Sequence, residues 1–387
     1  LNLILFVLCA IGFTHSASPD DALPRYLRGM HWDKVQEHLK EDLRLSNDVV
    51  PCKYAIDLSV NVRGHAGAKK SDFNGTVSIF LRFLSAVDKV ELHANGLIIE
   101  KAEFLESLIL SKAVGVATIS TNSDRETTTI HANRTIEPTE EFMLQITYRG
   151  SAKMDEYGLY ESWDPKMNKS LDSNGPFVLA SRNFPTGARF WFPCIDEPER
   201  NATFELQIDH PSGLTAYSNT EVMRTKSMSD GRTLTVFEKT PSIPTYQVAL
   251  SVNHLSSRSL NVKGLKKVRL IRSNNSVEIP SPFSFHELQE KQKRYEGDNI
   301  TLYIEWKLET SGDIILRELS KSKLDIIILE GTHTHSFQPG LITIGSASLP
   351  FSNFVGNFTH LLTRSLISTR HSEHLWLNDM LGTVLRN

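Results

Sequence analysis

The sequence has 387 residues, of which 40% are hydrophobic, and this is enough to bury the cores of two domains or of one large one. Its 42 basic and 45 acidic residues give a net charge of −3, with no basic stripe along the chain. Nucleic-acid binders carry a concentrated basic face, so the composition argues against a nucleic-acid partner.

The chain opens with an apolar run, Leu1 to Phe13, followed by the small residues of Thr14 to Ser18. This pattern predicts a secretory signal peptide over 1–18 and a secreted or extracellular protein. The run is short for a membrane span of about 20 residues, yet a signal anchor, and hence a membrane-anchored ectodomain, is the alternative. Residues 19–43 are polar with helix-like apolar spacing, and we interpret them as a lead-in segment.

From Tyr54 to Val62 apolar and polar residues alternate, which predicts a strand with one buried face. The same alternation returns over 77–83, 142–148 and 204–208. Repeated short strands of this kind predict an all-β domain over 44–254.

Beyond residue 254 the pattern is mixed. Strand-like apolar runs occupy 302–306 and 324–329, and helix-compatible stretches occupy 282–294 and the region from about 353 onward. We therefore predict an α+β multidomain protein whose residues 255–387 form part of a mixed α/β domain.

Seven N-x-S/T sequons agree with a secretory route. Six are predicted glycosylation sites: Asn74, Asn133, Asn168, Asn201, Asn274 and Asn299. Outside the signal segment the cysteines are Cys52 and Cys194, the sole candidates for one disulfide, and we interpret them as two buried free thiols.

One segment resembles a known family closely. Phe184 to Pro198 reads F-P-T-G-A-R-F-W-F-P-C-I-D-E-P and is similar to the E-P-T-D-A-R-x-x-F-P-C-F-D-E-P segment of M1 aminopeptidases, the aminopeptidase N-like zinc enzymes. Further matches are Arg44-Leu45, Thr245-Tyr246 and Lys323 to Ile326, so the resemblance runs from about 44 to 387. It implies a saddle-like β domain followed by a thermolysin-like peptidase domain.

The resemblance extends to the zinc site, although most of its chemistry is absent. Leu375 to Asp379 resembles the L-W-L-N-E that carries the third zinc ligand, which places Gly356 to His360 on H-E-x-x-H. Gly356 then replaces the first His ligand and Asn357 the general-base Glu, while His360 and Asp379 are vestigial ligands. Because the Asp379 carboxylate is one methylene shorter than Glu, it reaches a metal only if the helices approach more closely.

Catalytic zinc needs three protein ligands, and Gly356 offers no side chain. Asn357 cannot accept a proton, and loss of a general base alone costs about 10²–10⁴ in rate. The resemblance therefore implies no catalytic residue and no bound cofactor, with zinc as the metal of the family.

Substrate recognition is altered too. M1 enzymes bind the free α-amine through the Glu of a G-A-M-E-N loop, and here Phe337 or Gln338 replaces that Glu. Arg182 stands where the family has a Gln that precedes the E-P-T segment, and its cation would repel a substrate ammonium.

A rival metal site consists of His371, Glu373 and His374, with His333 or His335 added. This alternative is incompatible with the family match over 376–379, and we interpret the segment 370–374 as solvated and polar.

Three functions stay open. The first is a catalytically inactive M1 aminopeptidase-like protein that binds peptides or extracellular proteins. The second is a weak zinc aminopeptidase that uses His360, Asp379 and a third ligand. The third is a non-functional gene fragment, suggested by the missing initiator Met and the end at Asn387.

Overall fold

A computed structural model describes residues 44–106, 113–138, 141–154, 157–163, 177–260, 267–273, 323–329 and 335–345. The predicted signal peptide, the lead-in segment, the strand at 302–306 and the helices from 282 and 353 lie outside these residues. In the described part of the chain the structure is mostly β-sheet, and its helical elements are the short 3-10 turns η3 (Ala188–Phe190) and η4 (Thr245–Gln247).

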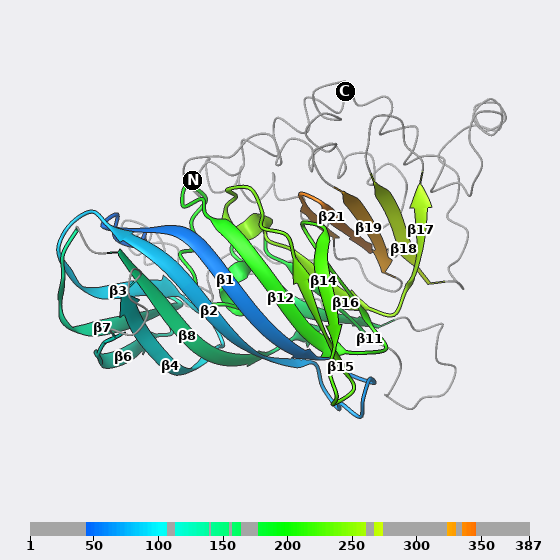
Figure 1. Ribbon diagram of the computed structural model, residues 1–387, viewed down its shortest axis with the longest axis horizontal. Coiled ribbons are helices and arrows are strands. Elements are labelled where there is room, and N and C mark those ends of the chain that lie inside the picture. The colour runs from blue at the N-terminus through cyan, green and yellow to red at the C-terminus, as the bar shows by residue number, and fades with distance from the viewer. Residues whose placement is uncertain are drawn as a thin grey trace, which may run out of the picture.

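An eight-stranded sheet forms the largest layer, in the order β14-β15-β12-β1-β2-β8-β4-β5, and curves across the front of Figure 1. Its strands are β14 (Val222–Ser227), β15 (Arg232–Phe237), β12 (Thr203–Pro211), β1 (Val49–Asn61), β2 (Asp72–Phe83), β8 (Glu141–Ser151), β4 (Ile98–Glu106) and β5 (Ala113–Val114). The four strands predicted from alternation are β1, β2, β8 and β12, and they lie side by side. The predicted inward residues from Tyr54 to Val62 are at most 2% exposed.

Two smaller sheets complete the β domain. The first, in the order β13-β16-β11-β10-β9, consists of β13 (Thr215–Ser218), β16 (Leu250–Asn253), β11 (Phe177–Arg182), β10 (Gly158–Trp163) and β9 (Lys153–Met154). The second, in the order β3-β7-β6, consists of β3 (Val87–His93), β7 (Thr127–Ile136) and β6 (Val116–Asn122).

A mixed sheet follows in the chain, in the order β17-β18-β19-β21-β20. Its strands are β17 (Ser256–Leu260), β18 (Val268–Arg272), β19 (Leu324–Leu329), β21 (Leu341–Gly345) and β20 (His335–Gln338). The central strands β18, β19 and β21 are parallel, and every residue of β19 is buried, as expected for a parallel strand covered on both faces. The thermolysin-like domain over 255–387 stays a prediction, because most of its residues lie outside the described ranges.

The sheet that contains β11 is a middle layer, because its alternate residues enter two hydrophobic clusters. Leu179 and Val252 join the core beneath the eight-stranded sheet. Val178 and Ala180 face the other way and pack with residues of the mixed sheet such as Ile327. The three sheets are therefore stacked, and burial of apolar side chains on both faces of the middle layer stabilises their arrangement.

The two cysteines are free, as we predicted, but the prediction that both are buried is wrong for one of them. Cys52 is exposed, because the β1–β2 register shifts between Pro51 and Lys53 and a bulge residue there lies on the solvent side. Cys194 is fully buried, and burial raises the pKa of its thiol well above its usual value.

Candidate functional site

The predicted zinc positions Gly356, Asn357, His360 and Asp379 lie outside the described residues. The same holds for the rival ligands His371, Glu373, His374 and His333, and for the side chain of His335. Within the described ranges no three His, Cys, Asp or Glu side chains are grouped closely enough to hold a metal ion.

The predicted substrate-binding positions fall on two strands that contact each other. Arg182 ends β11, whereas Phe337 and Gln338 end β20, at the edge of the mixed sheet. The fold thus brings together positions that are more than a hundred residues apart in the sequence. The side chain of Phe337 lies outside the described atoms.

Gln338 is turned inward and is only 2% exposed. Its amide nitrogen, Nε2, donates to the Ser336 hydroxyl oxygen at 2.7 Å, and the Ser336 hydroxyl donates to Oε1 of the same amide at 2.9 Å. A neutral amide in a local pair with a hydroxyl presents no negative charge to an ammonium group. Gln338, one of the two residues predicted at the amine-binding position, therefore carries no carboxylate for an amine.

Arg182 is half-buried, and its guanidinium stacks on the Tyr157 ring at 4.8 Å from the centroid. Tyr157 leads into β10 and keeps 39% of its surface exposed. A cation–π contact of this kind attracts the guanidinium to the ring without using any of its N–H donors in a hydrogen bond to an acceptor oxygen.

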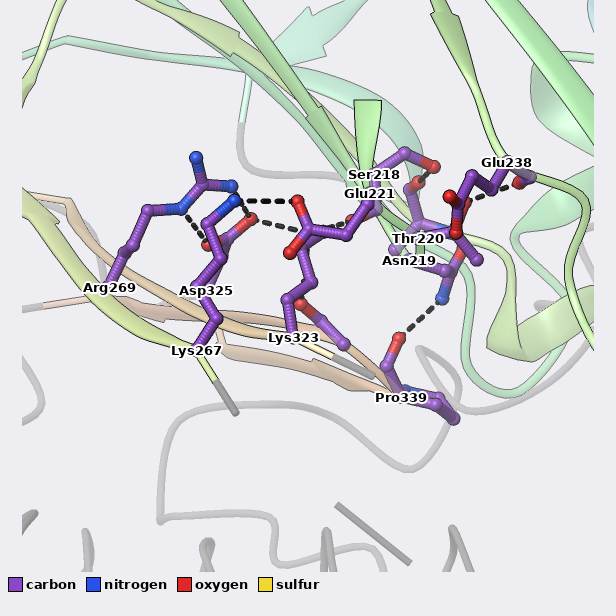
Figure 2. A network of polar contacts seen from close by, with 12 residues as sticks. Ser218, Asn219, Thr220, Glu221, Glu238, Lys267, Arg269, Lys323, Asp325 and Pro339 are labelled. Carbon is purple, nitrogen blue, oxygen red and sulfur yellow. Dashed lines mark hydrogen bonds and ion pairs between the residues drawn. The ribbon is translucent and has the colours of Figure 1, made fainter. Parts of the chain in front are cut away.

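The turn between β20 and β21 packs against the end of β13. Gly340 has φ +78, and the Asn219 amide nitrogen donates to the Pro339 carbonyl at 2.7 Å (Figure 2). The same amide donates to the Gln247 carbonyl at 2.8 Å, and its oxygen accepts from the backbone N–H of Ala249 at 2.8 Å. Asn219 therefore joins the β domain to the hairpin that carries Gln338.

A buried ionic group lies beside this turn (Figure 2). Asp325 is fully buried and accepts two bonds from Arg269, at 2.6 and 2.7 Å. Lys323 is also buried, and its ammonium donates to the Asp325 carboxylate and to the carbonyl oxygens of Ser218 and Gly340. Burial lowers the pKa of Lys323, and the Asp325 carboxylate opposes that effect.

The peptidase M1 N-terminal domain family matches residues 50–247, about half of the chain. The chain belongs to this family. The matched region ends at the last residue of η4, beside Asn219, and contains Arg182.

Relatives of this M1-family chain are peptidases. The human thyrotropin-releasing hormone-degrading ectoenzyme is 24% identical over 344 residues, which are 88% of this chain and 30% of the enzyme. The puromycin-sensitive aminopeptidase of Caenorhabditis elegans is 25% identical over 84% of this chain and 32% of its own length. The membrane alanyl aminopeptidase of Manduca sexta is 27% identical over 63% of this chain and 25% of its own length. The chain thus spans about a third or less of the length of these relatives.

Arg189 and Asp196, from the segment 184–198 that resembles the M1 family, belong to another buried polar group, separate from the one around Asp325. The Arg189 guanidinium donates to Asp196 at 3.0 Å and to Glu126 at 3.1 Å, and Thr245 donates to the other Asp196 oxygen at 2.6 Å. His93 accepts a bond from the backbone N–H of Asp196 through Nδ1, at 3.1 Å. Arg189, Asp196 and Thr245, which are among the residues that match the family, therefore have a structural role as members of a buried hydrogen-bonded group.

The pH dependence of stability tests the state of His93. Burial, followed by the Arg189 and Arg125 charges, lowers the pKa of its imidazole well below the ordinary 6.5. The unfolded chain therefore binds a proton below pH 6.5 that the folded chain does not, so stability falls as the pH drops through that region. We expect His93 to contribute a slope of up to about 1.4 kcal/mol per pH unit.

The measurement is the urea midpoint between about pH 7.5 and about pH 5.5. The slope should decrease in His93→Gln, whose amide oxygen can still accept the Asp196 N–H. His131→Gln is the matched control, because His131 lies on β7 and is half-buried. Equal slopes in both variants would show that His93 titrates in the folded chain as it does in the unfolded one.

Three predicted glycosylation sites can be placed, and each is exposed: Asn74, Asn133 and Asn201. Asn168, Asn274 and Asn299 lie outside the described ranges. A helix able to cross a membrane is not present in the part of the chain that the structure describes.

Proposed function

We propose that this chain is a catalytically inactive M1 aminopeptidase-like protein that binds peptides or extracellular proteins. The proposal rests on the family resemblance over 356–379, under which Gly356 stands at the first zinc His and Asn357 at the general base. A glycine provides no ligand and an amide provides no base, so the donor set does not fit a catalytic zinc ion.

Loss of amine recognition supports the same function. Gln338 is buried and paired with Ser336, and Arg182 supplies a positive charge on the contacting strand. An M1 enzyme that releases N-terminal residues needs to bind an ammonium group, and neither side chain favours one. Binding without hydrolysis requires only the folded scaffold and a complementary surface.

We further propose an extracellular location, secreted or membrane-anchored. Support comes from the apolar N-terminal run, from the exposed sequons such as Asn74, and from relatives named as an ectoenzyme and a membrane aminopeptidase. The exposed sequon positions are accessible to glycan addition on the folded chain.

The test measures bound metal and hydrolysis on the same sample of the full chain expressed through the secretory route. We expect less than about 0.1 equivalent of zinc after dialysis and no cleavage of amino-acid arylamides with zinc added. Restoration of the donor set in Gly356→His/Asn357→Glu/Asp379→Glu is the companion variant, and we expect it to retain zinc through three ligands.

Chelator-sensitive cleavage by the unaltered chain would overturn the proposal. One equivalent of zinc that is lost in His360→Ala would instead support the weak zinc aminopeptidase, with an additional ligand from elsewhere in the chain.

A further inference from the structure

The bonding state of Arg182 differs from that of three other buried or half-buried arginines. Arg189, Arg232 and Arg269 each donate to a carboxylate. Arg182 contacts the face of Tyr157, and among the described residues its guanidinium has neither a carboxylate partner nor a hydrogen-bond acceptor. Its five N–H donors are therefore available to a ligand.

Partial burial makes these donors effective. The Arg182 side chain is half-buried, so water screens its charge less than that of a fully exposed arginine. The Tyr157 ring lies on one side of the guanidinium, and no acceptor among the described residues occupies the N–H donors, which can match the two oxygens of a carboxylate.

The backbone that carries Arg182 is fixed by close packing. Gly187 lies so near that a Cβ there would be 2.3 Å from the Arg182 carbonyl oxygen, and Gly187 N donates to Asn183 O at 2.5 Å. On the other side, Arg182 pairs with Gly158 of β10. A donor group on such a support loses little conformational entropy when a ligand binds.

A second cation lies at the same end of the sheet. The Lys153 ammonium is 5.4 Å from the centroid of the Phe190 ring. Phe190 packs against Gly158, the residue that pairs with Arg182. Both cation–aromatic pairs therefore lie near Gly158.

We propose that Arg182 and Tyr157 bind a carboxylate group of a peptide. This inference rests on the proposed peptide-binding function and specifies its ligand as anionic. The carboxylate accepts two parallel bonds from the guanidinium edge, and Tyr157 contacts the adjoining apolar part of the ligand. The source of the carboxylate is an acidic side chain or a C-terminus, because both have the same fork geometry.

Three short peptides separate these sources in calorimetric titrations of the full chain with chelator present. The probes are acetyl-Glu-Ala-Ala-amide, its Gln analogue, and the Gln analogue with a free C-terminal carboxylate. We expect the Glu peptide or the free acid to bind about 10- to 100-fold more tightly than the neutral peptide, as charge-assisted bonds predict. Preference for one of the two acidic probes identifies the source.

Variants assign the preference to Arg182. Arg182→Gln should abolish it, and Arg182→Lys should retain only part of it, because an ammonium lacks the fork. Arg224→Gln is the matched control, since it removes the same charge from the exposed strand β14 and should leave the preference unchanged.

Equal binding of acidic and neutral probes, or no binding of either acidic probe at about 1 mM, would overturn the proposal. An unchanged preference in Arg182→Gln would overturn it as well. Because the titrations contain chelator, they are independent of hydrolysis. Zinc-dependent cleavage would therefore contradict the proposed function alone, and loss of the carboxylate preference would contradict this inference alone.

Discussion

Gly340→Ala is expected to lower the free energy of unfolding by more than about 3 kcal/mol. Gly340 has φ +78, a conformation that costs a residue with a Cβ about 1–2 kcal/mol. In addition, the new Cβ would lie 1.9 Å from the backbone oxygen of Asn219. That oxygen cannot retreat easily, because the Asn219 side chain is bonded to Pro339, Gln247 and Ala249.

Two measurements check this expectation. The first is the urea midpoint, and the second is hydrogen–deuterium exchange of peptides that cover 335–345, where the hairpin should lose protection. The matched control is Gly231→Ala: Gly231 has φ +77, but a Cβ there would meet nothing within 4 Å. It should cost only about 1 kcal/mol, so equal losses in the two variants would show that contact with Asn219 contributes nothing.

The strands of the β domain were predictable because their signal is local. Each strand needs one apolar face, so alternation along a few residues is enough to identify β1 or β12 without any knowledge of its neighbours. Alternation does not predict irregularities such as β-bulges. The bulge that exposes Cys52 depends on a register shift against β2, and nothing in the sequence near residue 52 specifies that shift.

The candidate site was predictable only in part, because its contacts are long-range. The family resemblance predicts Arg182, and Phe337 or Gln338, as substrate-binding positions, and the structure adds that their strands contact each other. The contact of Arg182 with Tyr157 depends on the register between β11 and β10, because Tyr157 directly precedes β10, and the sequence does not specify that register. Likewise, the sequence does not predict the contact of Gly340 with Asn219, because a Pro-Gly pair predicts a turn but not the residue against which the turn packs.

Asp325→Asn should destabilise the chain by about 3–5 kcal/mol, because it leaves two buried or half-buried cations without their counterion. The Asp325 carboxylate is fully buried and accepts from both Arg269 and Lys323. Asparagine has nearly the same shape, so the loss would come from charge rather than from a cavity. We expect the loss in the urea midpoint and in amide protection of β18 and β19.

Two comparisons separate this charge effect from a general sensitivity of the region. Lys267→Gln removes the neighbouring pair with Glu221, whose side chains are 45% and 31% exposed, and should cost less than about 1 kcal/mol. Replacing the whole group, in Arg269→Met/Lys323→Met/Asp325→Leu, removes every buried charge at once and should cost less than Asp325→Asn alone. If the triple variant were instead the least stable, the carbonyl oxygens of Ser218 and Gly340, which accept bonds from Lys323, would be the dominant partners in this junction.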